Sequence, residues 1–208
     1  MAAGRRVPPG RAGIMWLRHR LGVAEHGADL LRRKLTMLVH EQDRLHRERA
    51  AASAAWAEAD RTARTWLARA VAVDGDRAVE LAADPAPAQI VPQWTTLMGV
   101  RYAVAPAVDL PPASGGRHVP GGPALAHAID GYRAAALAAA VSAAATAAAA
   151  TVDEEVRGTR QRVRALDRHW IPWLRGALAA AQLQLDELEN ADIVRRRRAG
   201  GDRHGIRE

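Results

Sequence analysis

The sequence of 208 residues contains no cysteine and no phenylalanine, and aromatic residues make up only 4% of it. Without cysteine the chain can form no disulfide, thiolate nucleophile, cysteine-type zinc site or iron–sulfur cluster, which suits a reducing cytosol. Lysine is nearly absent as well, because Lys34 is the only lysine among the 30 basic residues. The apolar share of 49% depends heavily on alanine. This composition predicts long, thin helices rather than a thick core.

The charge is strongly positive. The formal net charge is +7 and the isoelectric point is about 11.1. A chain of this charge is expected to bind anionic partners, and nucleic acid, an acidic membrane face and an acidic protein surface all agree with it.

No secretory signal is recognisable at the start, because Arg5, Arg6 and Arg11 are followed by only a short apolar run before Arg18. Residues 134–152 carry no charge and are nearly long enough to span a bilayer. They consist mainly of alanine, whereas favourable insertion comes from Leu, Ile, Phe and Val. We therefore interpret this stretch as a soluble alanine-rich helix and expect a cytoplasmic protein without a membrane span.

The N-terminal part of the sequence carries a heptad pattern. Mainly apolar residues recur at alternating steps of four and three, the repeat of a coiled-coil seam. The pattern predicts a helix over residues 11–73 after a tail of residues 1–10, and its seam would be about 85 Å long. The seam positions are Leu17, Leu21, Ala24, Ala28, Leu31, Leu35, Leu38, Gln42, Leu45, Arg49, Ala52, Trp56, Ala59, Ala63, Trp66, Ala70 and Val73. Trp56 and Trp66 are therefore predicted to be core residues.

The middle of the chain, residues 74–124, is rich in proline and glycine. No long helix is compatible with this composition. Residues 89–91 and 101–104 are candidates for the short strands of a β-hairpin, with Pro92 and Pro106 restricting them to sheet edges.

A second seam predicts a helix over residues 125–198, followed by a loose tail of residues 199–208. Consecutive four-residue steps surround Pro172, which indicates a stutter and a bend. The seam positions are Val152, Val156, Thr159, Val163, Leu166, Trp170, Leu174, Leu178, Ala181, Leu185 and Leu188.

Since neither helix can bury its stripe alone, the expected fold is all-α, a long antiparallel two-helix coiled coil with the middle segment at one end. If Leu17 lies near Arg198, the basic ends of the chain come together. The arginines of this expected cationic tip are Arg5, Arg6, Arg11, Arg18, Arg20, Arg195, Arg196, Arg197 and Arg198.

No catalytic, cofactor-binding or metal-binding constellation is recognisable. The glycine-rich residues 115–122 lack the Gly-Lys-Ser/Thr ending of a phosphate loop. The histidines never lie four residues apart, so no helical zinc pair forms. We therefore expect no enzyme activity, cofactor or metal in this chain.

The opening of the sequence combines a Pro-x-Arg entry, a Leu/Arg-rich helix, a glycine and a Leu-Leu-x-x-Lys segment, at Pro9, Arg11, Leu17, Arg20, Leu21, Gly27, Leu30, Leu31 and Lys34. The closing helix has a Thr-Arg-x-Arg-Val-x-Ala-Leu start, an Ile-Pro pair and an acidic stretch, at Thr159, Arg160, Arg162, Val163, Ala165, Leu166, Ile171, Pro172, Asp186, Glu187 and Glu189. With these motifs, both ends of the sequence resemble the D subunit of the V-type and A-type rotary ATPases. In the middle, Met98, Gly99, Val100 and Pro106 are similar to a short Met-Gly-Val segment of the family.

The resemblance implies a central rotor axle that does no bond chemistry itself and couples ion flow, such as proton transport, to ATP synthesis or hydrolysis. The implied partners are the catalytic and non-catalytic nucleotide-binding subunits of a hexamer, the small F subunit and the coupling subunit above the membrane ring. The implied location is cytoplasmic, on a membrane-bound complex. The candidate contacts are the Met98–Val100 segment and the tip arginines, of which Arg11, Arg18, Arg20 and Arg195–Arg198 are the main ones.

Two other classes stay open from the residues alone. A nucleic-acid-binding coiled coil would show a steep salt dependence. A free-standing basic scaffold would be stable and monodisperse without partners.

Overall fold

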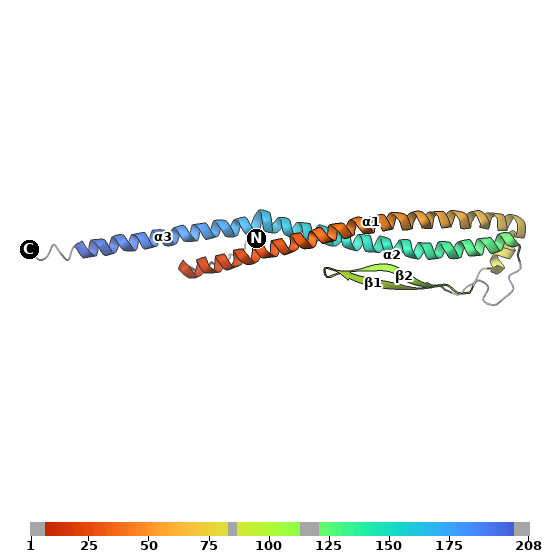
Figure 1. Cartoon of the computed structure of the whole chain (residues 1–208), viewed down its shortest axis with the longest axis horizontal. Helices are drawn as coiled ribbons and strands as arrows, with labels where there is room; N and C mark the ends of the chain where they lie inside the picture. Colours follow the sequence, from red (N-terminus) through yellow and green to blue (C-terminus); the bar gives the residue numbers. More distant parts are fainter. Residues whose placement is uncertain (1–6, 83–86, 113–120, 202–208) are drawn as a thin grey trace, which may run out of the picture. The chain divides into compact units, whose positions relative to one another are not determined.

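The computed structural model describes residues 7–82, 87–112 and 121–201, with side chains described up to residue 197. The elements are helix α1 (Gly10–Ala82), strands β1 (Gln89–Leu97) and β2 (Val100–Asp109), helix α2 (Pro123–Ala165), the π-helical turn η1 (Leu166–Trp170) and helix α3 (Ile171–Gly201) (Figure 1). The expected all-α fold with a β-hairpin in the middle is confirmed. The chain divides into two compact units, which we call the terminal unit (Met1–Leu35 and Gly158–Glu208) and the hairpin unit (Thr36–Arg157).

In the terminal unit, the start of α1 packs antiparallel against α3. The direction follows from two ion pairs, Arg11 with Glu189 at 2.8 Å and Glu25 with Arg175 at 2.6 Å. The core is the predicted seam, with Leu17 and Leu174 fully buried. The fully or nearly buried members of this cluster are Leu17, Ala24, Ala28, Ile171 and Leu174.

The register of this pairing differs from the expected one. Leu17 packs with the cluster around Leu174, Leu178 and Ala181, rather than near Arg198. The reason is hydrophobic burial: α3 has seam residues to bury only as far as Leu185, since residues 186–197 are all exposed. The large apolar side chains of α1 and α3 pack together, and the basic end of α3 extends beyond this apolar seam.

The stutter predicted around Pro172 takes the form of the π-helical turn η1. The N–H of Ile171 donates to the carbonyl of Leu166, five residues back. Pro172 has no N–H, and its ring would clash with a carbonyl of the preceding turn in a regular α-helix. One extra residue in the turn absorbs both the proline and the consecutive four-residue steps of the seam.

In the hairpin unit, α1 and α2 approach closely through small residues. Ala63 and Ala70 are fully buried. A Cβ atom added at Gly131 would lie 3.0 Å from the Cα of Ala63, so only glycine fits there without a shift. Trp56, on the seam two turns before Ala63, is 43% exposed, so the prediction that it belongs to the core is wrong.

Helix α1 continues to Ala82, beyond the predicted end at residue 73. Its path breaks at Gly75, which has a φ of +78°. The final turns are retained because Ala78, Val79 and Ala82 pack on the cluster formed by Ala70, Leu125 and Ala128. Trp66 packs on the same cluster, as predicted for a seam residue, and its ring lies 4.4 Å from that of His127.

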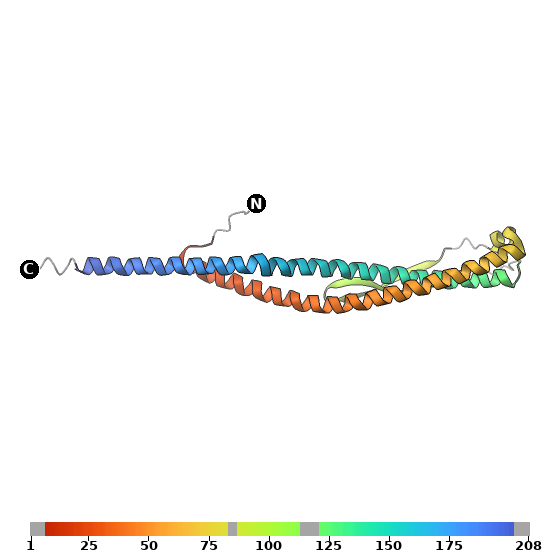
Figure 2. The ribbon, with the colours of Figure 1, turned by 90° about the horizontal axis from the view of Figure 1, so that it is seen from above.

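Strands β1 and β2 form a two-stranded antiparallel hairpin, longer than the predicted strands. Met98 and Gly99 form the two-residue turn, and both have positive φ angles (50° and 79°), as a type I′ turn requires. The register shifts between Val91 and Gln93, where Pro92 and Pro106 lie on the two strands. The hairpin lies beside α1 and α2 (Figure 2).

The continuous helical segment Pro123–Arg197 is long and apolar enough to cross a membrane by length and composition alone. Its most apolar window has a mean hydropathy of 1.8, and a third of that window is buried inside the molecule. Burial against neighbouring helices is what the core helix of a soluble protein also shows.

Candidate partner-binding surfaces

The end of α3 forms a basic, exposed surface in the terminal unit. The pairing partner of Glu189 is Arg11, close to the start of α1, and α3 continues for twelve more residues to Gly201. In this extension, Ile193 and Val194 are about half exposed, and Arg195, Arg196 and Arg197 are exposed. Arg195 pairs with Asp192 of its own helix at 3.3 Å. Helix α3 thus presents cations and apolar side chains together.

The structure does not gather all the predicted arginines at this end. Arg11 pairs with Glu189, whose hydrogen bond raises the pKa of the guanidinium. Arg20 lies 5.1 Å over the ring of Trp16, and Arg18 is exposed. Because Arg195 lies six residues past Glu189, it is about 9 Å further along the helix axis. The N-terminal arginines therefore line the side of the helix pair. Arg5 and Arg6, and the side chain of Arg198, lie outside the described part of the chain.

The hairpin turn is the second candidate surface. Met98 is 45% exposed. Its backbone occupies the left-handed region, which costs a residue with a Cβ about 1–2 kcal/mol of conformational free energy. Gly99 is exposed beside it. Val100 is buried in the molecule, so of the three predicted contact residues only Met98 and Gly99 are available at the turn.

The outer strand of the hairpin is exposed and uncharged. Ile90, Val91 and Trp94 are each more than half exposed. The guanidinium of Arg101 lies 4.7 Å over the ring of Trp94, a cation–π contact that places one positive charge on this surface. An apolar patch with a single cation is typical of a protein-binding surface rather than of a catalytic site.

A hydrogen-bonded group of three side chains joins the hairpin to α1. The hydroxyl of buried Tyr102 donates to Oε1 of Glu41 at 2.5 Å. Arg44 donates to both oxygens of the same carboxylate, at 2.5 and 3.0 Å. These bonds, first those from Arg44, lower the pKa of Glu41, and burial together with the carboxylate raises the pKa of Tyr102. Sequence reasoning missed this group, because Tyr102 lies 61 residues from Glu41 and no local pattern connects them.

A second polar group lies between α1 and α2. Gln42, the first polar residue of the seam, donates to Oδ1 of Asp153 at 2.7 Å, and His46 lies 2.9 Å from the same atom. Burial raises the pKa of Asp153, but the bonds from Gln42 and His46 outweigh it and the net pKa is lowered. The polar residue in the seam is thus satisfied within the helix pair.

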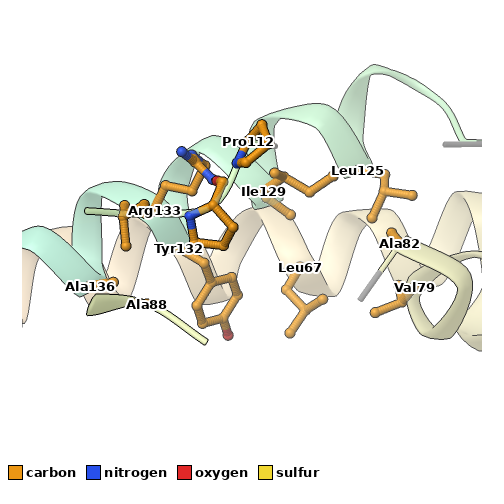
Figure 3. A pocket seen from close by; sticks show the side chains of 13 residues that line it. Leu67, Val79, Ala82, Ala88, Pro112, Leu125, Ile129, Tyr132, Arg133 and Ala136 are labelled. Atoms are coloured by element: carbon orange, nitrogen blue, oxygen red, sulfur yellow. The ribbon is translucent and has the colours of Figure 1, made fainter. Parts of the chain in front are cut away.

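An apolar hollow of about 470 Å³ lies among α1, α2 and the segment that follows β2. Leu67, Leu125, Ile129 and Tyr132 line it, together with Arg133, which donates to the carbonyl of Pro111 (Figure 3). It has no carboxylate or imidazole on its described walls. Over the described residues, no three histidine, aspartate or glutamate side chains come together as metal ligands.

The paired antiparallel helices, the π-helical turn η1 before Ile171 and the hairpin define a helical protein that offers contact surfaces. The family model for the D subunit of ATP synthase matches residues 14–201, so the chain belongs to the ATP synthase D-subunit family.

Curated relatives agree with this family. The V-type ATP synthase D subunit of Anaeromyxobacter dehalogenans strain 2CP-C is 32% identical over 90% of this chain and 92% of its own length. The V-type ATP synthase D subunit of Anaeromyxobacter sp. strain Fw109-5 is 30% identical over 93% of this chain and 92% of its own length. The resemblance seen in the sequence is confirmed.

Proposed function

We propose that this chain is the central rotor axle of a V-type or A-type ATP synthase or ATPase. In this role it transmits torque between the membrane ring that moves ions and the hexamer that binds nucleotides. The observation that carries the proposal is the family match over residues 14–201, which spans both helices of the antiparallel pair and the hairpin. An axle must pass a twist along its length, and two helices interlocked through a shared seam resist twisting better than one.

The axle acts without bond chemistry of its own. Its asymmetric surface would favour a different nucleotide state at each catalytic interface as it turns. The described surfaces support this role because they are apolar, cationic or both, as protein contacts are, and the hollow of Figure 3 is lined mainly by apolar groups. In this proposal the complex is bound to a membrane, and this chain lies on its cytoplasmic side.

The two candidate surfaces are assigned to different partners. The end of α3, with Arg195, Arg196 and Arg197, would enter the hexamer of catalytic and non-catalytic nucleotide-binding subunits. The hairpin turn at Met98 and Gly99 would meet the small F subunit or the coupling subunit above the membrane ring.

The test is native mass spectrometry on the tagged chain captured at mild salt from its own cells. One copy of the chain with three copies each of two nucleotide-binding subunits is the expected composition. Capture of the chain alone, as a homodimer or with nucleic acid would contradict the axle proposal and favour a basic coiled-coil scaffold.

The same measurement tests the basic end. Replacing Arg195, Arg196 and Arg197 with alanine removes three exposed charges and should lower the recovery of the nucleotide-binding subunits severalfold. The matched control replaces Arg61, Arg64 and Arg69, which are exposed on α1 of the hairpin unit. Equal recovery from both triple variants would remove the α3 end as a contact site.

A further inference from the structure

Tyr102 makes a polar contact between the hairpin and helix α1. Its side chain is only 4% exposed, and its hydroxyl donates to Glu41 on α1. The carboxylate of Glu41 is 13% exposed and is held in place by Arg44. A fixed, charged acceptor makes the phenol hydrogen bond stronger than one between two neutral groups.

The hairpin has a weak point between this contact and its base. At the register shift between Val91 and Gln93 the strands carry Pro92 and Pro106, neither of which has an N–H to donate. The ladder therefore separates into a basal part and a distal part, residues 93–104, which contains Tyr102 and the turn.

The space below the distal part is poorly filled. A hollow of about 530 Å³ separates Ala103, Val104 and Ala105 of β2 from α1 and α2. Its floor is made mostly of alanine, namely Ala51, Ala52, Ala55, Ala145 and Ala148. Small side chains across an open space provide few dispersion contacts, so the hairpin is packed weakly beside this hollow although Val100, Tyr102 and Ala103 are buried.

We propose that Tyr102 is a positioning residue that latches the distal hairpin to α1, and that the hairpin is a flap hinged at the Pro92–Pro106 bulge. The latch fixes where the Met98–Gly99 turn stands. The consequence for partner binding rests on the proposed function, in which that turn is a contact. The latch itself does not depend on any partner.

Hydrogen exchange on the full-length chain tests the latch directly. In Tyr102→Phe, amides of residues 93–104 should exchange about ten- to a hundredfold faster, the range for losing one hydrogen bond to a charged group. Amides of α1 and α2 should be unchanged. The control is Tyr132→Phe, which alters the only other tyrosine of the chain, 40% exposed on α2. Exchange within twofold of the wild type in Tyr102→Phe would overturn the proposal.

Replacing Glu41, which accepts the hydrogen bond from Tyr102, gives an independent test of the latch. Glu41→Ala should accelerate the same amides as Tyr102→Phe, and the double variant should be no faster than either single variant, because both remove one bond. Fully additive effects would show that the residues act separately and would overturn the latch.

The contact between the hairpin turn and its proposed partner is tested separately. If the turn is a contact, Tyr102→Phe should weaken recovery of the F or coupling subunit while leaving the nucleotide-binding subunits in place. Faster exchange with unchanged recovery would retain the latch and reject the turn as a contact, so the two proposals fail separately.

Discussion

Single residues set how closely the helices of the hairpin unit approach, and Gly131 is the clearest case. Gly131→Ala would place a methyl group 3.0 Å from the Cα of Ala63, so the backbone of one helix must move. We expect the free energy of unfolding to fall by about 1–3 kcal/mol, as for other overpacked sites. Thermal unfolding followed by circular dichroism measures it.

Gly158→Ala on the same helix is the control for that substitution. The nearest atom to an added Cβ there is the flexible end of Arg162, at 3.8 Å. Because alanine is a better helix former than glycine, the free energy of unfolding of this variant should rise by about 0.5–1 kcal/mol. Equal effects of the two substitutions would contradict close packing at Gly131.

A pH effect is expected from Glu41. Its pKa is lowered below the ordinary 4.5, chiefly by the hydrogen bonds from Arg44. A carboxyl group of this kind contributes its stability above the unfolded pKa and loses it as the pH falls through the lowered folded value. The difference in melting temperature between wild type and Glu41→Gln should therefore be constant above about pH 5 and shrink in more acidic buffer. A difference that grows on acidification would contradict the pairing.

Residue-level prediction from the sequence succeeded where one side chain type dictates burial. Leu17, Leu38, Leu45 and Leu174 were predicted as seam residues and are buried. It failed at Trp56, because the exposure of an indole depends on how far away the opposite helix stands. The sequence around residue 56 gives no local signal of that distance.

Among the elements, the hairpin shows how turn chemistry fixes a register. Met98 occupies a left-handed conformation next to Gly99 in the turn. Asn-Gly is the favoured pair for a type I′ turn, so Met98→Asn should stabilise the hairpin by about 1 kcal/mol. Exchange of the hairpin amides would report the gain.

A substitution at Gly99, next to Met98, should have the opposite effect on the stability of the hairpin. Gly99 has a φ of +79°, and Gly99→Ala should destabilise the hairpin by about 1–2 kcal/mol. If both variants move exchange in the same direction, the turn does not have the observed geometry.

The elements themselves were largely predictable, but their ends were not. The heptad pattern indicated both long helices, and the consecutive four-residue steps indicated the irregularity at η1. The sequence missed the last turns of α1 after Gly75, because these turns depend on tertiary packing of Val79 and Ala82 rather than on local preference. The axial register was also missed, since seams repeating every seven residues allow several alignments.

At the scale of the whole molecule, the apolar segment of α2 raises the question of membrane insertion. We expect the chain expressed alone to be released from membranes by alkaline carbonate, because its apolar window is mainly alanine and is partly buried against other helices. Fractionation followed by immunoblotting checks this. Resistance to carbonate extraction would contradict a peripheral location.

The close contact at Gly131 and Ala63 has a mechanical consequence. The distance between packed helix axes depends on the side chains at their contact, and glycine against alanine gives a small distance. The bending rigidity of two bonded rods rises steeply with the separation of their axes. This part of the helix pair should therefore behave as a comparatively soft spring. In the proposed rotor axle, such a spring would store elastic strain between successive rotational steps and return it.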